Sequence, residues 1–196
     1  EKYHLFDLTS ALINIHFPQN QQQLQKARER LKFEELFYIQ LQILKQAKLH
    51  SLKSEGYRMP VVGKTFHDFY QNKVPFALTN AQKRVIKEIH EDMKSGHQMN
   101  RLLQGDVGSG KTLVALLCSL LAKDNGYQTC IMAPTEILAN QHLETISSML
   151  DGTGVRVELL TGSTTTKQRK TLLTDLIQGD IDILIGTHAL LEDRVQ

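Results

Sequence analysis

Apolar and polar residues alternate along the N-terminal part of the chain with the period of a helix. From about Gln22 to Lys48 the sequence contains no Gly or Pro, and apolar residues recur at spacings of three to five positions, beginning at Leu24 and Ala27. This pattern predicts one long amphipathic helix. A first helical stretch ends ahead of it at His16-Phe17-Pro18, because proline disfavours the helical conformation in the residue before it.

The periodic pattern breaks between the long helix and the rest of the chain. Gly56, Pro60, Gly63 and Pro75 interrupt this stretch, which predicts a linker or irregular docking segment with a boundary near Pro75. We therefore divide the chain into a helical segment with its linker, residues 1–75, and a second domain, residues 76–196.

Beyond Phe76, short apolar runs alternate with longer helical patterns. A helix is predicted over Ala81–Lys94, and the units that follow it have the size of βαβ crossovers, which implies a parallel sheet covered on both faces. In such sheets ligands bind at the carboxyl ends of the strands. The predicted strands are Arg101–Gln104, Thr129–Ala133, Arg156–Leu160 and Ile181–Ile185, and the predicted helices between them are Lys111–Lys123, Glu136–Met149 and Thr166–Ile177.

Composition limits the class of protein but does not indicate an activity. The 196 residues are 41% hydrophobic, enough for one core with an appended segment, and the net charge of +2 does not by itself indicate a nucleic-acid partner. No apolar run has the length of a membrane span and no secretory signal opens the chain, so we expect a cytoplasmic protein without a membrane partner. Cys118 and Cys130 lie in apolar runs and are predicted to be reduced core residues. Because the chain starts at Glu1 without methionine and stops at Gln196 without a cap, we expect it to be part of a longer protein.

One segment carries specific chemistry. It matches the pattern G-x-x-x-x-G-K-[ST], whose backbone N–H groups hold the phosphates of a nucleotide and whose glycines permit the close approach. Lys111 would place a positive charge between the terminal phosphates, and Thr112 would offer its hydroxyl to Mg²⁺. The sequence therefore predicts a site for ATP and Mg²⁺, with Lys111 and Thr112 as its catalytic residues and Thr112 as its metal contact. The loop consists of Gly105, Asp106, Val107, Gly108, Ser109, Gly110, Lys111 and Thr112.

Gln82, at the start of the predicted helix over Ala81–Lys94, is a candidate for adenine recognition. A glutamine amide presents a donor and an acceptor side by side, as the N6 and N7 edge of adenine requires. An exposed glutamine with no ligand is the ordinary alternative, and the phosphate loop further along the chain favours the functional interpretation.

Several of these motifs together resemble the first motor domain of RecG-type branched-DNA helicases. The order and spacing also look like those of superfamily 2 motifs Ia, Ib and Ic, and the N-terminal runs are similar to that family's passage from a DNA-wedge domain to the motor. The resemblance implies a RecA-like P-loop fold and covers nearly the whole chain. It is carried by the runs Leu78-Thr79-Asn80-Ala81-Gln82, Asn100–Thr112, Ala133–Ala139, Leu160–Ser163, Ile185–Leu190, Ile15–Pro18 and Arg30–Leu36.

By that resemblance, three short pairs at strand ends face DNA: Pro134-Thr135, Thr161-Gly162 and Thr187-His188. Backbone N–H groups and hydroxyls in such loops contact phosphates without base preference. Each pair also has a purely local interpretation: Thr135 can cap the following helix, and His188 can satisfy nearby backbone groups. Glu136 is interpreted as a helix-start residue favoured by the helix dipole.

The basic residues Lys167, Arg169 and Lys170 are interpreted as a solvated helix face rather than a DNA patch. Charge at these positions alone does not distinguish the two, since a helix face exposed to water commonly carries lysine and arginine.

Hydrolysis also needs carboxylates that hold Mg²⁺ and orient water, and in helicases of this superfamily an Asp-Glu pair supplies them. The sequence has no Asp-Glu dipeptide, so we expect that pair beyond Gln196 and expect the chain to bind nucleotide weakly without hydrolysing it. By resemblance, the full-length protein remodels forks and Holliday junctions as an ATP-dependent motor on DNA, and we expect a monomer. A transcription-repair coupling translocase of the same superfamily and a P-loop ATPase or kinase without a DNA partner remain alternatives.

Overall fold

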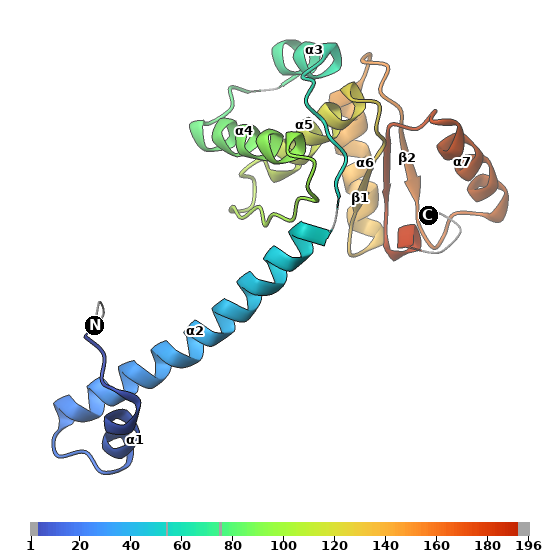
Figure 1. The fold of residues 1–196 in the computed structure, drawn as a ribbon. Coiled ribbons are helices and arrows are strands. Elements are labelled where there is room, and N and C mark those ends of the chain that lie inside the picture. Colours follow the sequence, from blue (N-terminus) through green and yellow to red (C-terminus); the bar gives the residue numbers. More distant parts are fainter. Residues whose placement is uncertain (1–3, 54, 75, 192–196) are drawn as a thin grey trace. The chain divides into compact units, whose positions relative to one another are not determined.

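The computed structural model describes residues 4–53, 55–74 and 76–191, and the chain forms two compact units, Glu1–Glu55 and Gly56–Gln196 (Figure 1). We describe each unit by itself. The division falls at Gly56, ahead of the boundary near Pro75 that the sequence predicted, and Pro75 itself lies outside the described residues. The boundary lies earlier because residues 56–74 contact later parts of the second unit: Gly56 donates to the Gly96 carbonyl, and the helix over 64–72 packs on the helix over 111–124.

The first unit consists of helices α1 (Leu8–His16) and α2 (Gln21–Lys53). Asp7 caps α1 by accepting a hydrogen bond from the Ser10 amide at 2.9 Å. The two helices pack where Ala11 and Ala27 are both fully buried, because these small side chains let the backbones approach. The predicted long helix is confirmed: α2 has 33 residues and a length of about 50 Å. None of the described helices is both long and apolar enough to cross a membrane.

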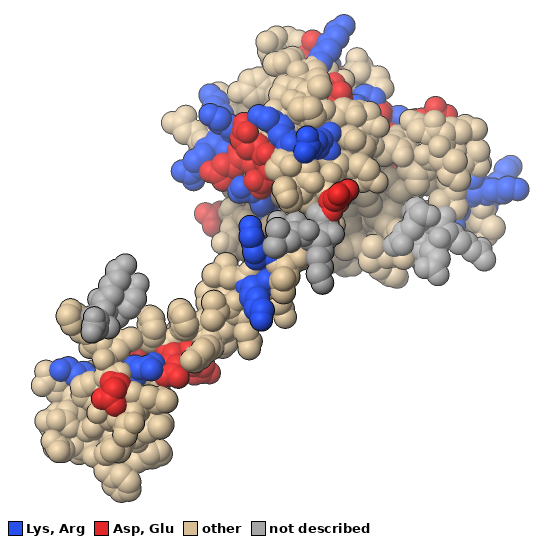
Figure 2. Space-filling view, viewed as in Figure 1, with Lys and Arg blue, Asp and Glu red and all other residues tan. Residues whose placement is uncertain are grey.

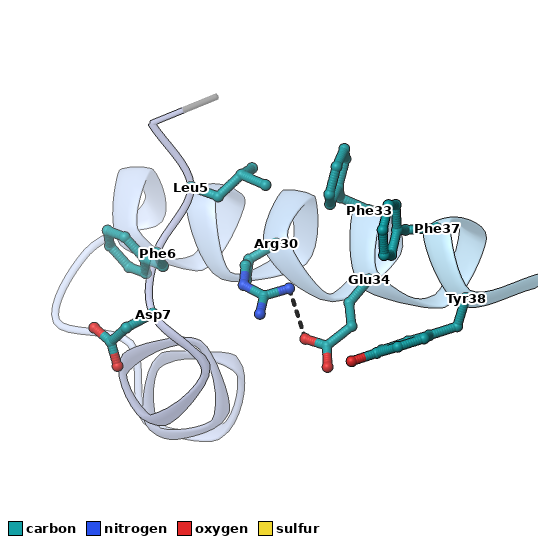
Figure 3. A pocket seen from close by; sticks show the side chains of 8 residues that line it. All are labelled: Leu5, Phe6, Asp7, Arg30, Phe33, Glu34, Phe37 and Tyr38. Carbon is teal, nitrogen blue, oxygen red and sulfur yellow. Dashed lines mark ion pairs between the residues drawn. The ribbon is translucent and has the colours of Figure 1, made fainter. Parts of the chain in front are cut away.

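The apolar side of α2 is covered only near its start. Leu36, Ile39 and Ile43 are exposed, so within the first unit the second half of the predicted amphipathic stripe does not form a buried face. Nearer α1, aromatic residues of α2 and the segment before α1 surround a hollow of about 480 Å³ (Figure 3). An ion pair between Arg30 and Glu34, at 2.6 Å, lies beside it. The lining residues are Leu5, Phe6, Asp7, Arg30, Phe33, Glu34, Phe37 and Tyr38.

The second unit opens with a helix that the sequence assigned to a linker. Helix α3 (Lys64–Asn72) packs on α5 (Lys111–Asp124), and its Phe69 is buried in the main core. Its N-cap, Gly63, has no side chain to offer, and the carboxylate of Asp124 takes that role. Asp124 accepts hydrogen bonds from three amides, those of Gly63 at 3.0 Å, Thr65 at 3.1 Å and Phe66 at 2.9 Å. The linker prediction was wrong over α3 because its stabilising cap comes from a distant residue.

A three-stranded parallel sheet forms the centre of the second unit (Figure 1). Its order is β1-β3-β2, so β3, the last strand along the chain, lies between the other two. The predicted α/β class, with a parallel sheet after a helical segment, is confirmed. The elements of this part are α4 (Asn80–Lys94), α5, β1 (Thr129–Met132), α6 (Glu136–Leu150), β2 (Val157–Leu160), α7 (Thr166–Gln178), β3 (Ile183–Gly186) and the 3₁₀ helix η1 (His188–Leu191).

Helices cover the two faces of the sheet unequally. On one face Ile183 and Ile185 join the core formed with α4, α5 and α6, and on the other Leu184 packs with Leu172 of α7. Cys130 is the register partner of Leu184, yet it is exposed. The prediction of a sheet covered on both faces therefore holds for β3 but is wrong for this strip of β1. Both cysteines are free as expected, but Cys130 is not a core residue, and Cys118 is half-buried.

The predicted strand over Arg101–Gln104 is absent from the described structure. Among residues 4–53, 55–74 and 76–191, no strand pairs with this segment to complete a ladder of hydrogen bonds, and β1 and β2 each pair only with β3. Leu103 still packs against the main core, whereas Leu102 is 83% exposed. This apolar run thus contributes to the core without becoming a strand.

The end of β3 leaves no room for a side chain. A Cβ built on Gly186 would lie 2.0 Å from the Leu160 carbonyl oxygen and 2.9 Å from Leu190 Cγ. Register pairs Gly186 with both Met132 and Leu160, so all three strands end level with this glycine.

Candidate nucleotide site and nucleic-acid interface

The predicted phosphate loop is an exposed turn that leads directly into α5. Gly108 and Gly110 have φ of +79° and +80°, left-handed values that glycine adopts without strain, and Gly110 is the N-cap of α5. No side chain caps this helix. Its first amides therefore lack partners within the helix, and together with the helix dipole they form a site for an anion.

Two of the loop glycines allow contacts that a side chain would block. A Cβ on Gly105 would lie 2.5 Å from Ser109 Oγ, and a Cβ on Gly110 would lie 2.5 Å from Gln82 Nε2. The loop is also braced by the Ser109 amide, which donates to the Asp106 carbonyl at 3.1 Å. The glycines thus permit a loop tight enough to surround a phosphate with backbone groups.

Lys111 bends back over this loop. Its Nζ donates to the carbonyls of Gly105 at 2.7 Å and Asp106 at 2.8 Å. Lys111 and Thr112 are both half-buried at the first turn of α5. The residues present fit a nucleotide phosphate with Mg²⁺: the Lys111 ammonium lies over the loop, no side chain caps the first amides of α5, and Thr112 next in the chain carries a hydroxyl.

Gln82 contacts the loop from α4. Its Oε1 accepts from the Thr79 amide at 2.8 Å in a capping box, and its Nε2 donates to the Ser109 carbonyl at 2.8 Å. Both ends of the amide are therefore engaged within the protein. The structure places Gln82 against the loop, while adenine recognition by this amide stays a prediction.

The three predicted DNA-facing pairs lie together at one edge of the sheet. Pro134-Thr135 follows β1, Thr187-His188 follows β3 and Thr161-Gly162 follows β2, and these parallel strands are neighbours that end level. The Ala133 amide donates to the Gly186 carbonyl at 2.8 Å, which joins the first two loops. Segments far apart in the sequence thus form one surface.

Not every residue of the three pairs is exposed at that surface. Pro134, Thr135, Gly162 and His188 are exposed, whereas Thr161 and Thr187 are each only 2% exposed. The Thr161 hydroxyl is 2.9 Å from Ser163 Oγ, and Thr187 Oγ1 has no hydrogen-bond partner among the described residues. A phosphate at this edge would therefore meet backbone amides and the exposed residues rather than these two hydroxyls.

Local roles coexist with these positions. Thr135 is the N-cap of α6 and accepts from the Leu138 amide at 3.3 Å, and His188 begins η1. Glu136 is the first residue of α6, as the helix-start interpretation expected, but its carboxylate also accepts from Ser163. Sequence reasoning missed this contact, and also the Gln82–Ser109 contact, because neither joins residues that are near in sequence.

Basic and acidic side chains are mixed on the face of the second unit that Figure 2 shows. Arg101 pairs with Glu88 at 3.1 Å and also with Asp92, whose hydrogen bond is the main cause of a raised pKa for the arginine. Lys167 and Lys170 lie exposed on α7, consistent with a solvated helix face. These ion pairs offset the positive charge of Arg101, so the strand-end loops remain the candidate contacts for DNA.

Comparisons with known proteins agree with this arrangement. Residues 79–196, more than half of the chain, match the model of the DEAD/DEAH box helicase family. The whole chain is 44% identical over 195 residues to the ATP-dependent DNA helicase RecG of Synechocystis sp., covering 23% of that protein, and 44% identical over 196 residues to RecG of Bacillus subtilis, covering 29% of it. A solved structure of RecG bound to a three-way DNA junction superimposes with a TM-score of 0.86 at 45% identity, over 97% of this chain and 26% of that one.

The resemblance to RecG-type helicases is thereby confirmed over the full length of the chain, which spans about a quarter of the relatives it matches. The predicted phosphate loop, the strand-end loops and the match over residues 79–196 all point to one assignment. The chain belongs to the DEAD/DEAH box helicase family.

Proposed function

We propose that this chain is the linker helix and the nucleotide-binding first motor domain of an ATP-dependent DNA helicase of RecG type, which remodels branched DNA in recombination and repair. The observation that carries the proposal is the grouping of three strand-end loops on one edge of the sheet in a unit that also contains a phosphate loop. The similarity to RecG over the whole chain supports it.

In this proposal the loop from Gly105 to Thr112 holds the phosphates of ATP. The free amides at the start of α5 and the Lys111 ammonium bind the terminal phosphates, exchanging the carbonyl contacts of Lys111 for phosphate oxygens. Thr112 would offer its hydroxyl to Mg²⁺, whose charge would offset that of the phosphates. Gln82 holds the loop from α4 and is the candidate for the adenine edge.

DNA would lie along the other set of loops. Backbone amides and exposed residues at Pro134-Thr135, Gly162 and His188 contact phosphates of the DNA backbone, which allows binding to DNA of any base sequence. Branched DNA is the partner, no membrane is involved, and the protein works as a monomer in the cytoplasm.

The chain by itself binds nucleotide weakly and does not turn it over in this proposal. Nucleotides of such motors lie between two motor domains, and residues 1–196 contain no Asp-Glu pair that could hold Mg²⁺ and orient water. Hydrolysis by the isolated chain that is lost on Lys111→Ala would contradict this view.

The test of the function uses the full-length protein. ATP hydrolysis is measured with and without a three-way DNA junction, in wild type and in Lys111→Ala. We expect strong stimulation by the junction and no turnover in the variant, because the ammonium is lost from the phosphates. ATP hydrolysis unaffected by DNA would overturn the proposal in favour of a P-loop enzyme without a DNA partner.

A further inference from the structure

A carboxylate joins two of the strand-end loops. Glu136, at the start of α6, accepts the Ser163 amide at Oε1 and the Ser163 hydroxyl at Oε2, each at 3.1 Å. Glu136 follows the loop after β1, and Ser163 lies in the loop after β2. These strands are not neighbours, since β3 lies between them, so the contact crosses the width of the sheet edge.

The loop that Glu136 holds is closed by its own hydrogen bonds. The Thr161 amide donates to Thr164 Oγ1 at 3.0 Å, and the Thr164 amide donates to the Thr161 carbonyl at 3.2 Å. Thr161 Oγ1 is 2.9 Å from Ser163 Oγ, which connects the buried threonine to the serine that Glu136 holds. Residues 161–164 therefore form one unit, and Glu136 sets the position of that unit relative to α6.

Glycine at position 162 allows the carboxylate to approach. A Cβ there would lie 3.3 Å from Glu136 Oε1, closer than ordinary van der Waals contact. Gly162 is exposed and is one of the residues expected to face DNA. The residue next to the phosphate backbone is thus also next to the Glu136 carboxylate.

Two effects of this carboxylate on DNA are possible, and they have opposite signs. A negative charge repels phosphates and occupies donors of Ser163, so its removal would strengthen binding. A carboxylate that orders the loop presents the remaining amides in a fixed geometry, so its removal would weaken binding. The bidentate contact and the closed loop favour the second effect, because both oxygens are committed to ordering residues 161–164.

We propose that Glu136 is a positioning residue for DNA: it holds the loop after β2 at a set distance from the loop after β1, so that both contact phosphates of one strand. This rests on the proposed function. Glu136 itself does not touch the DNA, and it acts through Ser163 and the amides of the loop.

The experiment uses the full-length protein and measures DNA-stimulated ATP hydrolysis as a function of three-way junction concentration. We expect Glu136→Ala to raise the half-saturating DNA concentration about tenfold, the effect of one lost phosphate contact. Glu136→Gln keeps one acceptor oxygen and should raise it about threefold. The KM for ATP and the rate at saturating DNA should stay near wild type, because Glu136 lies outside the phosphate loop.

A double-mutant cycle separates positioning from general damage. Ser163→Ala alone should raise the half-saturating DNA concentration about threefold, and adding it to Glu136→Ala should cause no further loss, because the two side chains act through one contact. Glu144→Ala removes the same charge from an exposed position on α6 and serves as the matched control, with no weakening of DNA binding expected.

Each outcome decides one question. If the wild type shows no stimulation by DNA, the proposed function fails and the inference with it. If the wild type is stimulated but Glu136→Ala binds DNA as well as or better than wild type, the positioning role is overturned while the function stands. Additive losses in the cycle, or an equal rise in the KM for ATP, would also overturn it, since they indicate damage beyond the Glu136–Ser163 contact.

Discussion

Replacing Asp124 with alanine should loosen α3 from the second unit. The carboxylate accepts three amide hydrogen bonds from residues 63–66, and Gly63, the N-cap, has no side chain that can replace it. A hydrogen bond to a charged group contributes about 1.5–3 kcal/mol when buried, and we take about 1 kcal/mol each because Asp124 is half-exposed. The Asp124 carboxylate is repelled by the negative end of the α5 dipole, and removing it therefore restores about 0.5 kcal/mol of stability. The net loss is therefore about 2–3 kcal/mol for Asp124→Ala and about half of that for Asp124→Asn, which keeps one acceptor oxygen.

Hydrogen exchange followed by mass spectrometry measures this loss locally in the 196-residue chain. Peptides covering residues 61–72 should exchange about 30- to 150-fold faster in Asp124→Ala than in wild type. Asp180→Ala, at an exposed aspartate of the same unit, is the control and should leave these peptides unchanged. Wild-type protection at residues 63–66 in Asp124→Ala would refute the reasoning, because it would mean that the three amides do not depend on the carboxylate.

Two further predictions concern the nucleotide site and a thiol. Gln82→Ala should weaken ATP binding about tenfold, because Nε2 no longer holds the Ser109 carbonyl. Isothermal titration of the chain with ATP and Mg²⁺ measures the affinity. An unchanged affinity would show that this hydrogen bond does not support nucleotide binding. Burial raises the pKa of the Cys118 thiol to about 11, so only about one molecule in a thousand carries the thiolate at pH 8 and alkylation is slow. In a Cys130→Ser variant, the iodoacetamide rate at Cys118 should rise about tenfold per pH unit from pH 7 to 9, and a rate independent of pH would show that the thiol does not titrate as described.

The sequence predicted those features that depend on local pattern. The helix following the phosphate loop, the three paired strands and the long helix α2 all show a period or motif within a few residues, and the structure has them where expected. The spacing of Phe66, Phe69 and Tyr70 was a helical signal within the supposed linker, but Gly63 and Pro60 outweighed it. The cap from Asp124 lies 61 residues away from Gly63, and no local pattern reveals it.

Two other differences have the same physical origin. Arg101–Gln104 has the composition of a strand, but a strand exists only where a neighbour supplies hydrogen bonds. The contact between Glu136 and Ser163 depends on the order of the strands, which brings residues 27 positions apart to the same edge. Alternating composition predicts that elements form, whereas side-chain contacts between them require the arrangement of the sheet.

The close approach at Gly186 has a consequence for natural variation in this protein. With the Leu160 carbonyl 2.0 Å from where a methyl group would stand, even alanine would push β2 and β3 apart at their ends. Such a wedge would move Thr187 and the turn after Leu160 while leaving the phosphate loop, on a separate helix, in place. A missense change at this glycine is thus expected to separate the two roles proposed for the domain: nucleotide binding at the phosphate loop should persist, while DNA binding at the strand-end loops should weaken.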